Sequence, residues 1–534
     1  MGPHVKSQDR PAHVPGGFVD RQRGEDAINI SERARKVMTE AGDRAAISFE
    51  DRDYSWAAID AFAQDLMRLM ETADPSGAAV AVVLRNRAVG AAAMFGVIAA
   101  RRTTLMVTPL QPAQNICADV RLLRPAVVIA DRQDWNDDLD AAARSVGAAG
   151  AEIADLDGRL VVAMRAGLER AAPGQAAETF PGAAMVVSTS GTTGAPKRAP
   201  FGWSVLDRYA RADDGLAAGR VLIQTNPLVT VGGIPVLASS VANPLHLVLM
   251  ERLDVARWAD LVERYKPRRA GLPPTGLRML LASGAPKEKF ASLECFTTGS
   301  APMSADEIDA FEAAFEKPLL YSYGATELGA TPVARWTLPL RAEWSVRKRG
   351  SVGRPVGGVE LRVVDQATGT PLPAGEEGLL EVRRATAPTP GEDGWIRTND
   401  LAVVDGDGFL FVRGRADDVI IRGGFKVPLP EIQAVLLQHE AVAGAAAVGL
   451  PDARLGQTPV AAVVLKPGAR PPREDELIAW ARERLAPYKV PTRLRIVEAL
   501  PMTQLLKVSR GELRALFNEP QPPAEARFLP ARRP

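Results

Sequence analysis

Short apolar runs alternate with helical patterns along most of this chain, and this alternation constrains the fold more than any other feature. Residues 79–84 form a valine-rich run, and the alanine- and glycine-rich apolar stretch 88–100 follows it. Further short apolar runs occupy residues 126–130, 221–224 and 245–249. Such runs are typical of buried strands, and strands that alternate with helices pair in parallel sheets. The sequence therefore predicts an α/β fold of layered sheets and helices.

The length of the chain and a second group of elements near its end predict two domains. A chain of 534 residues is too long for one ordinary core. After a turn signal at residues 405–408 and a strand at 409–412, the pattern changes near Gly414. The later elements are strands at residues 419–421, 445–448, 459–465 and 494–497, with helices from Pro430 and at 474–485. We therefore expect a large N-terminal domain, residues 1–416, and a small α+β C-terminal domain, residues 417–534.

Composition excludes several classes of protein. Lysine and arginine number 65 against 64 acidic residues, so bulk charge gives no reason to expect nucleic acid or an anionic membrane as partner. Only two cysteines, Cys117 and Cys295, are present, which excludes a disulfide framework and favours a reducing, cytoplasmic setting. Residues 1–24 contain no apolar segment like that of a signal peptide. The run 88–100 is too short to span a membrane, so we interpret it as a buried helix.

The most informative local feature is a loop rich in serine, threonine and glycine. Residues 188–197 read Ser-Thr-Ser-Gly-Thr-Thr-Gly-Ala-Pro-Lys and follow an apolar run at 183–187 that predicts a strand. Glycine lets the backbone N–H groups wrap phosphate oxygens, and Lys197 adds a positive charge. A solvated linker explains neither the preceding strand nor the Pro-Lys ending. A Walker A loop has different spacing, because Lys197 here follows Pro196 and precedes Arg198.

This loop resembles the signature of the ANL adenylate-forming superfamily, which includes acyl- and aryl-CoA synthetases, peptide synthetase adenylation domains and beetle luciferase. Further motifs follow in the family's order, and the resemblance extends over roughly residues 30–515. It implies that the small C-terminal domain is mobile and rotates about a hinge at Asp417. It also implies that the loop binds the phosphates of ATP through Thr189, Ser190, Gly191, Thr192, Thr193, Gly194 and Lys197.

Two segments resemble the walls of the family's adenine site. Residues 321–327 read Tyr-Ser-Tyr-Gly-Ala-Thr-Glu and resemble its aromatic-Gly-x-Thr-Glu motif. The resemblance implies that Tyr323 stacks on adenine, that Thr326 hydrogen-bonds the α-phosphate and that Glu327 helps to hold Mg²⁺. An aromatic face suits a purine, and a carboxylate near phosphates suits a hard cation. The turn Gly299-Ser300-Ala301-Pro302 resembles the opposite wall, to which we assign Ser300, Ala301 and Pro302.

The segment 395–401, Trp-Ile-Arg-Thr-Asn-Asp-Leu, resembles the family's aromatic-x-x-Thr-Gly-Asp motif. The resemblance implies that Asp400 accepts hydrogen bonds from both ribose hydroxyls, a role that suits an ionised carboxylate. Asn399 stands where the family usually has glycine. Because asparagine tolerates strained backbone angles better than most residues, we expect the turn there to survive.

Residues 414–418, Gly-Arg-Ala-Asp-Asp, followed by Gly-Gly-Phe-Lys at 423–426, resemble the family's hinge and the loop after it. The resemblance implies that Arg415 contacts the ribose or a phosphate. It also implies that Gly423 and Gly424 line the tunnel for the thiol arm, where a side chain would block passage.

Near the end of the chain, residues 500–510 resemble the family's Pro-x-Thr-x-x-Gly-Lys segment. Lys507 matches the catalytic lysine, which would bridge the attacking carboxylate and the α-phosphate. Leu506 replaces the usual glycine, a departure that affects the local turn more than the role of Lys507.

The segment 226–233, Asn-Pro-Leu-Val-Thr-Val-Gly-Gly, bears on the choice of acid. Many CoA synthetases of the family have a histidine where Thr230 stands and an aromatic residue at the position of Val229. No aspartate that would bind an amino acid's ammonium group is evident. We expect a wide, apolar pocket for a bulky aryl, alicyclic or polycyclic acid, with an ordinary fatty acid as the alternative. The residues assigned to this pocket are Val229, Thr230, Gly299 and Gly324.

The leading functional hypothesis is an acid–CoA ligase that uses ATP, Mg²⁺ and coenzyme A. A second is an adenylating enzyme that loads a carrier protein or passes acyl-AMP to a separate acyltransferase, since carrier protein and CoA present the same thiol arm. A third is a luciferase-like oxygenase. A degenerate nucleotide-binding protein is the last, and the presence of Lys507, Glu327, Asp400 and Arg415 argues against it.

Overall fold

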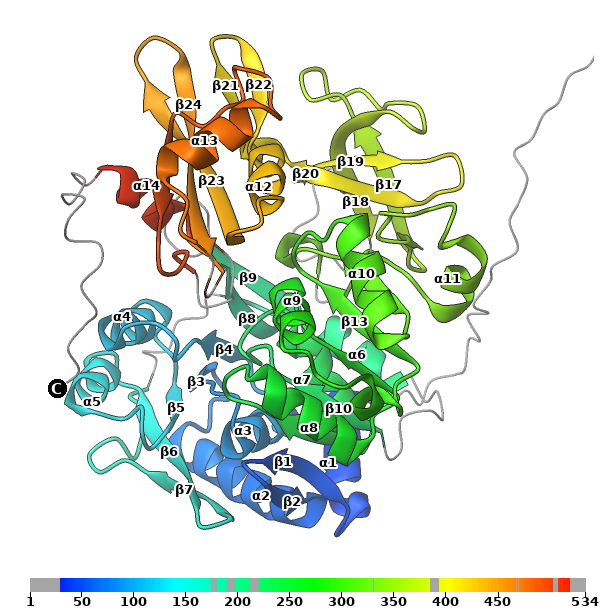
Figure 1. Cartoon of the computed structure of the whole chain (residues 1–534). Coiled ribbons are helices and arrows are strands. Elements are labelled where there is room, and N and C mark those ends of the chain that lie inside the picture. Colours follow the sequence, from blue (N-terminus) through cyan, green and yellow to red (C-terminus); the bar gives the residue numbers. More distant parts are fainter. Residues whose placement is uncertain are drawn as a thin grey trace, which may run out of the picture.

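The computed structural model describes residues 29–173, 180–189, 197–211, 220–329, 331–384, 393–466, 468, 470–502 and 508–518. These residues form five β-sheets with helices packed against them (Figure 1). Elements up to β20 build the large N-terminal part. The later elements, gold to red in Figure 1, gather in a smaller C-terminal domain. The predicted α/β fold with a large and a small domain is confirmed, whereas the boundary at Asp417 stays a prediction.

The largest of these sheets has seven strands in the order β7-β6-β5-β3-β4-β8-β9. Its central strands are parallel, as the apolar runs predicted, whereas the edge pairs β6–β7 and β8–β9 are antiparallel. The strands are β3 (Val80–Val83), β4 (Thr104–Val107), β5 (Val127–Asp131), β6 (Ala149–Leu156), β7 (Arg159–Met164), β8 (Ala183–Thr189) and β9 (Lys197–Gly202). The helices of this region are α2 (Trp56–Ala73), α3 (Ala88–Ala99), α4 (Ala113–Leu123) and α5 (Asp137–Ser145).

The apolar stretch at 88–100 forms α3, and every residue of this helix is buried. Small residues let α3 approach α2 closely, since a Cβ added to Gly96 would lie 3.3 Å from the Cα of Ala63. Trp56 stacks on Phe95 with ring centroids 5.7 Å apart. The stretch is therefore part of the core. None of the helices in the described ranges is long and apolar enough to cross a membrane.

Two further sheets complete the α/β part of the large domain. The first is a four-stranded sheet with the order β10-β11-β1-β2, and the second is a five-stranded sheet with the order β12-β13-β14-β15-β16. The first contains β1 (Ala45–Phe49), β2 (Arg52–Ser55), β10 (Val221–Gln224) and β11 (His246–Leu249), with α1 (Ile30–Ala41), α6 (Trp203–Arg211), α7 (Gly233–Ala242) and α8 (Val255–Tyr265) nearby in sequence. The second contains β12 (Arg269–Gly271), β13 (Cys295–Gly299), β14 (Leu319–Tyr323), β15 (Ala334–Arg335) and β16 (Arg354–Pro355), with α9 (Pro274–Ala282), the single turn η1 (Lys287–Phe290), α10 (Ala305–Phe315), the single turn η2 (Thr326–Leu328) and α11 (Leu338–Trp344).

An antiparallel sheet follows, of which the sequence pattern indicated only the strand near 409–412. Its strands, in order, are β17 (Val359–Val364), β18 (Glu377–Arg384), β19 (Trp395–Val404) and β20 (Leu410–Arg415). Charged residues interrupt these strands, so they do not read as apolar runs. The buried Glu381 in β18 pairs with Arg362 at 2.6 Å and with Arg397 at 2.8 Å across the two neighbouring strands. Charge pairing thus replaces apolar contact at this point of the sheet.

The C-terminal domain contains the strands and helices that the sequence predicted, together with one strand and one helix, β22 and α14, that it did not. Its sheet consists of β21 (Val419–Arg422), β22 (Phe425–Pro428), β23 (Val442–Asp452), β24 (Gly456–Leu465) and β25 (Arg493–Ile496), and its helices are α12 (Leu429–Leu437), α13 (Glu474–Arg482) and α14 (Arg510–Asn518). A core of its own includes Ile432, Leu436 and Leu477. The single helical turn η3 (Ala416–Asp418) separates β20 from this domain and contains the predicted hinge residue.

At pH values below about 6.5 the large domain should become less stable, because His246 at the start of β11 is buried. The Nε2 atom of His246 lies 2.6 Å from Ser48 Oγ, and its ring meets Tyr265 edge-on. Burial lowers the pKa of His246, and the negative charge of Asp53 opposes this only in part. The unfolded chain therefore binds the proton more readily than the folded chain. The contribution of His246 to the stability is fully present above the unfolded pKa and is lost as the pH falls through the folded pKa.

Thermal unfolding midpoints between pH 7.5 and 5.5 test this prediction. The wild type should lose more stability over that interval than His246→Gln, by up to about 1.4 kcal/mol per pH unit. Identical pH dependence in the two proteins would contradict it.

Candidate active site

Two predicted segments meet at the carboxyl ends of the parallel strands β13 and β14, the edge at which open α/β sheets bind ligands. Gly299 at the end of β13 lies opposite Ser322 of β14. A Cβ added to Gly299 would lie 2.8 Å from both the carbonyl oxygen and the Oγ of Ser322, so this close approach requires glycine. Ser300 follows with a positive φ of 68°, and the Tyr321 hydroxyl donates to the Ala301 carbonyl at 2.7 Å. The segment 299–302 and the end of β14 therefore lie side by side.

Tyr323, the last residue of β14, joins this edge to the antiparallel sheet. Its phenol donates a hydrogen bond to Asp400 Oδ2 in β19, which is 77 residues away in sequence. Burial, and next the charge of Asp400, raise the pKa of Tyr323 far above its ordinary value. The phenol therefore stays protonated and serves as the hydrogen-bond donor to Asp400.

Asp400 is also the cross-strand partner of Arg415, because β19 and β20 are paired in that register. The backbone N–H of Asp400 donates to Thr398 Oγ1 at 3.1 Å, and this buried hydroxyl donates to the Leu380 carbonyl at 2.8 Å. Three residues that the motifs assigned to adenine, to the ribose hydroxyls, and to the ribose or a phosphate are therefore linked by a hydrogen bond and a strand pairing. We call Tyr323, Asp400 and Arg415 the nucleotide cluster.

The structure corrects the expectation of a turn at Asn399. We expected a turn with glycine-like backbone angles there, but Asn399 lies within β19 and is not among the residues with positive φ. Extended backbone suits any residue, so nothing at this position requires glycine.

The residues after Tyr323 form the turn η2, which carries the exposed Glu327. The buried Arg384 supports the chain beyond it, donating to the carbonyls of Leu328 at 3.0 Å and Thr331 at 2.9 Å. Gly324 lies against Pro332, whose Cα would be 3.4 Å from a Cβ on this glycine. Sequence reasoning missed Arg384, because nothing local distinguishes it from a surface arginine.

The chemistry of Glu327 fits Mg²⁺. In the described part of the chain no group of three or more histidine, cysteine, aspartate or glutamate side chains could by itself hold a metal ion. Mg²⁺ keeps several waters and needs only one or two carboxylates when substrate phosphates supply the other oxygens. Glu327 is one exposed carboxylate four residues after Tyr323, so its chemistry meets that requirement.

The strands β8 and β9 form the hairpin that carries the predicted phosphate loop. Thr189 and Lys197 are cross-strand partners at its end. Arg198 in β9 bonds to Ser188 Oγ and to Asp119 in α4, which anchors the hairpin on a helix. The loop residues Ser190, Gly191, Thr192, Thr193 and Gly194 lie outside the described residues, as does Lys507. The side chains of Thr189, Lys197, Thr326 and Asp417 also lie outside the described part.

The predicted acid-pocket segment lies between β10 and α7. Val229 is buried, and Thr230 is half-buried. The Thr230 hydroxyl donates to the Pro227 carbonyl at 2.8 Å and its backbone N–H donates to the same atom at 3.2 Å. This hydroxyl is therefore bonded within its own turn, which leaves the methyl group as the part of Thr230 that suits an apolar ligand.

Gly423 and Gly424 form the turn between β21 and β22 in the C-terminal domain. Their φ angles are 57° and 88°, in the region that favours glycine. A Cβ added to Gly424 would meet no atom within 4 Å, whereas one added to Gly423 would lie 3.2 Å from Leu455. Both glycines are exposed.

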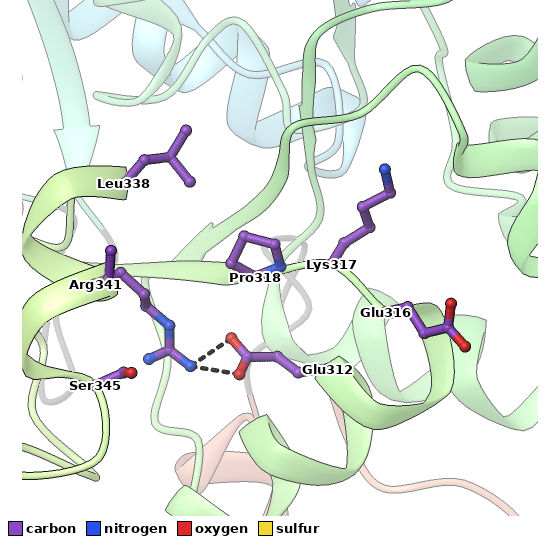
Figure 2. A pocket seen from close by; sticks show the side chains of 8 residues that line it. Glu312, Glu316, Lys317, Pro318, Leu338, Arg341 and Ser345 are labelled. Atoms are coloured by element: carbon purple, nitrogen blue, oxygen red, sulfur yellow. Dashed lines mark hydrogen bonds and ion pairs between the residues drawn. The ribbon is translucent and has the colours of Figure 1, made fainter.

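A surface hollow of about 530 Å³ lies next to α10 and α11, and Figure 2 shows the side chains that line it. Arg341 pairs there with both carboxylate oxygens of Glu312. The lining residues are Glu312, Glu316, Lys317, Pro318, Leu338, Arg341, Ala342 and Ser345. None of them is a predicted site residue, so we assign this hollow no part in the reaction.

The turn at 299–302, the Tyr323–Asp400 hydrogen bond and the β8–β9 hairpin are thus the parts of the predicted site that the described residues show. The model of the AMP-binding enzyme family matches residues 34–387, and that of the AMP-binding enzyme C-terminal domain matches residues 431–507. The chain belongs to the AMP-binding enzyme family.

Its relatives agree with this membership. The chain is 30% identical to 4-coumarate–CoA ligase-like 6 of Oryza sativa subsp. japonica, covering 77% of this chain and 73% of that one. It is 34% identical to 2-succinylbenzoate–CoA ligase of Bacillus pumilus (strain SAFR-032), covering 62% and 68%. ATP-bound MatB from Rhodopseudomonas palustris has the same fold, with a TM-score of 0.78 at 23% identity over 92% of this chain and 99% of that chain. The chain is thus an AMP-forming ligase of the acyl- and aryl-CoA synthetase branch of the ANL superfamily.

Proposed function

We propose that this enzyme activates a bulky, apolar carboxylic acid with ATP and then transfers the acyl group to the thiol of coenzyme A. The observation that carries the proposal is the nucleotide cluster, in which Tyr323, Asp400 and Arg415 converge in a chain of this family. Asp400, held by the Tyr323 phenol, would accept the ribose hydroxyls, and Arg415 would lie beside it to face a phosphate.

In the first half-reaction, a carboxylate oxygen of the acid attacks the α-phosphorus of ATP, and the bond to the leaving pyrophosphate breaks. The carboxylate is already ionised at neutral pH, so this step needs no general base. Two anions approach each other, so catalysis rests on positioning and on cancelling charge. Lys507 and the loop N–H groups would supply that cancellation, and Mg²⁺ held by Glu327 would add to it.

In the second half-reaction, the sulfur of coenzyme A attacks the acyl carbon, the bond to AMP breaks and the thiol proton is lost to solvent. We propose that the C-terminal domain rotates about Asp417 between the two steps, removing Lys507 and bringing Gly423 and Gly424 to the site. The turn at η3 and the exposure of both glycines support this proposal.

The acid pocket would be lined by Val229, Thr230, Gly299 and Gly324. Two observations support an apolar ligand: Val229 is a buried apolar residue of the pocket segment, and the Thr230 hydroxyl is bonded to the Pro227 carbonyl. The substrates in the names of the two relatives, 4-coumarate and 2-succinylbenzoate, are both aryl acids. We therefore place aryl acids first, ahead of alicyclic, polycyclic and straight-chain fatty acids.

Acid-dependent exchange of labelled pyrophosphate into ATP tests the first half-reaction without any thiol. The acid panel is 4-coumarate, 2-succinylbenzoate, benzoate, cyclohexanecarboxylate and hexanoate. We expect exchange with at least one aryl acid and weaker exchange with hexanoate. Exchange with hexanoate alone would favour the fatty acid alternative, and no exchange with any acid would contradict the assignment of the site.

Replacing Thr230 with histidine should narrow the pocket. The larger ring would displace bulky acids more than small ones, and we expect the ratio of kcat/KM for 4-coumarate to that for hexanoate to fall by about tenfold. Thr230→Ser, which keeps the bond to Pro227, is the matched control. A uniform effect of Thr230→His on all acids would count against this pocket.

A further inference from the structure

We propose that the side-chain amides of Asn86 and Gln224 are positioning elements of the acid pocket, because they fix the backbone of residues 226–230. The inference rests on the proposed function, in which Val229 and Thr230 line that pocket. Neither amide belongs to any of the sequence motifs described above.

Asn86 lies between β3 and α3 and is only 5% exposed. Its Nδ2 donates to the carbonyl of Asn226 at 2.9 Å and to that of Met250 at 3.2 Å. Its Oδ1 accepts the backbone N–H of Leu228 at 2.7 Å. A side-chain amide has two N–H donors and one carbonyl acceptor, and here both kinds bind backbone groups from distant parts of the chain. Asn86 therefore holds the ends of β10 and β11 together.

Gln224, the last residue of β10, binds the same carbonyl group. It is 8% exposed, and its Nε2 donates to the Asn226 carbonyl at 2.7 Å. The Asn226 oxygen thus accepts from two side-chain amides. Buried amides that lose their partners carry a desolvation cost, so both side chains resist displacement of this carbonyl.

The anchored atoms are directly coupled to the pocket residues. Leu228 is fully buried, and a Cβ on Gly233 would lie 1.9 Å from its carbonyl oxygen, so the two backbones are in close contact. Thr230 is bonded to the Pro227 carbonyl, and Gly233 N–H donates to the Thr230 carbonyl at 2.9 Å. In so tight a turn, a shift of Leu228 must move Val229 and Thr230 as well.

Asn86 itself is held by ion pairs on both sides. Arg85 bonds Asp134 at 2.6 Å and Glu251 at 3.1 Å, while Arg87 lies 3.3 Å from Glu251. Since Glu251 follows Met250, these pairs fasten the turn containing Asn86 to the end of β11. The backbone that carries the Asn86 amide is therefore held in place, as a positioning residue requires.

The predicted signature is selective for the acid. The contacts of Asn86 run to the acid-pocket segment and to β11, whereas the nucleotide cluster is built from β14, β19 and β20. Loosening the segment should weaken acid binding without changing how ATP binds. A residue with a merely structural role would affect both substrates together.

The test compares Asn86→Ala and Asn86→Asp with the wild type, using the most active acid of the panel. Aspartate keeps the acceptor for Leu228 but loses both donors. We expect the KM for the acid to rise about tenfold in each variant, while the KM for ATP changes by less than about twofold. Equal changes in the two KM values, or no change in either, would overturn the inference.

A second variant distinguishes the inference from simple misfolding of the Asn86 variants. A measurement made without substrate keeps the test valid if no acid of the panel is accepted. Gln224→Met keeps the length of the side chain but loses the donor, and should give a smaller effect in the same direction. Asp74→Asn is the control, because Asp74 holds a buried turn through Ala78 N–H and Arg102, before the start of β3, whereas Asn86 follows the end of that strand. Its acid-to-ATP KM ratio should stay at the wild-type value.

Hydrogen exchange at residues 226–233 measures how firmly this backbone segment is held, without any substrate. Exchange there should speed up by about tenfold or more in the Asn86 variants and not in Asp74→Asn. Unchanged exchange would overturn the inference, even if no acid of the panel is a substrate. Failure of the wild type with every acid, together with faster exchange in the variants, would reject the proposed function and leave the positioning role supported.

Discussion

Replacing Lys507 with alanine is expected to lower the rate of acyl-adenylate formation by roughly two to three orders of magnitude. The lysine would place one positive charge between the carboxylate and the α-phosphate, where charge must be cancelled as the two anions meet. Thioester formation from synthetic acyl-AMP should be largely unaffected, because Lys507 would leave the site before the thiol arrives. Rapid-quench measurement of acyl-AMP, with a separate assay starting from acyl-AMP, reads the two steps independently.

The matched control is Lys466→Ala, which removes an exposed lysine from the same domain. Both half-reactions should proceed normally in this variant. Equal loss of the two half-reactions in Lys507→Ala would contradict the role assigned to Lys507, since it would indicate damage to the domain.

Replacing Gly424 with leucine should have the opposite selectivity. Adenylation is expected to stay within about threefold of the wild type, whereas thioester formation should fall by about two orders of magnitude. In this structure a Cβ added to Gly424 meets no atom within 4 Å, so the substitution leaves room at the start of the side chain. The obstruction would arise only when the turn enters the site and the thiol arm must pass it.

The positive φ of Gly424 adds a strain of about 1–2 kcal/mol for any other residue, so backbone strain needs its own control. Gly408→Leu supplies it, since Gly408 has a φ of 78° in the turn between β19 and β20 and a Cβ added to it meets no atom within 4 Å. Normal acyl-CoA synthesis by Gly424→Leu would remove these glycines from the thiol path. Equal loss of thiolation in Gly408→Leu would assign the effect to strain.

The parallel strands were predictable because they are buried on both faces and read as apolar runs. Residues 79–84 and 126–130 became β3 and β5 with shifts of one residue at their ends. The antiparallel β17 and β18 were missed, since residues such as Arg362 and Glu381 break their apolar pattern. Their pairing satisfies those charges only once the strands are side by side, which no local window of sequence reveals.

In the candidate site, too, local sequence predicted individual residues but not the contacts between them. Motifs identified Tyr323 and Asp400 separately, but the hydrogen bond between them joins residues 77 positions apart and emerges only in the fold. Asn86 carried no sequence signal at all. Its partners Asn226 and Leu228 lie 140 and 142 residues away, so its amide could not be distinguished from a surface asparagine.

The most direct test of the central claim is mass spectrometry of the products formed from ATP, Mg²⁺ and each acid of the panel, with and without coenzyme A. The account predicts acyl-AMP and pyrophosphate without coenzyme A, and acyl-CoA, AMP and pyrophosphate with it, for at least one aryl acid. Acyl-AMP that persists unchanged in the presence of coenzyme A would contradict the assignment of coenzyme A as acceptor and favour a carrier protein or a separate acyltransferase. No acid-dependent pyrophosphate under either condition would contradict the account as a whole.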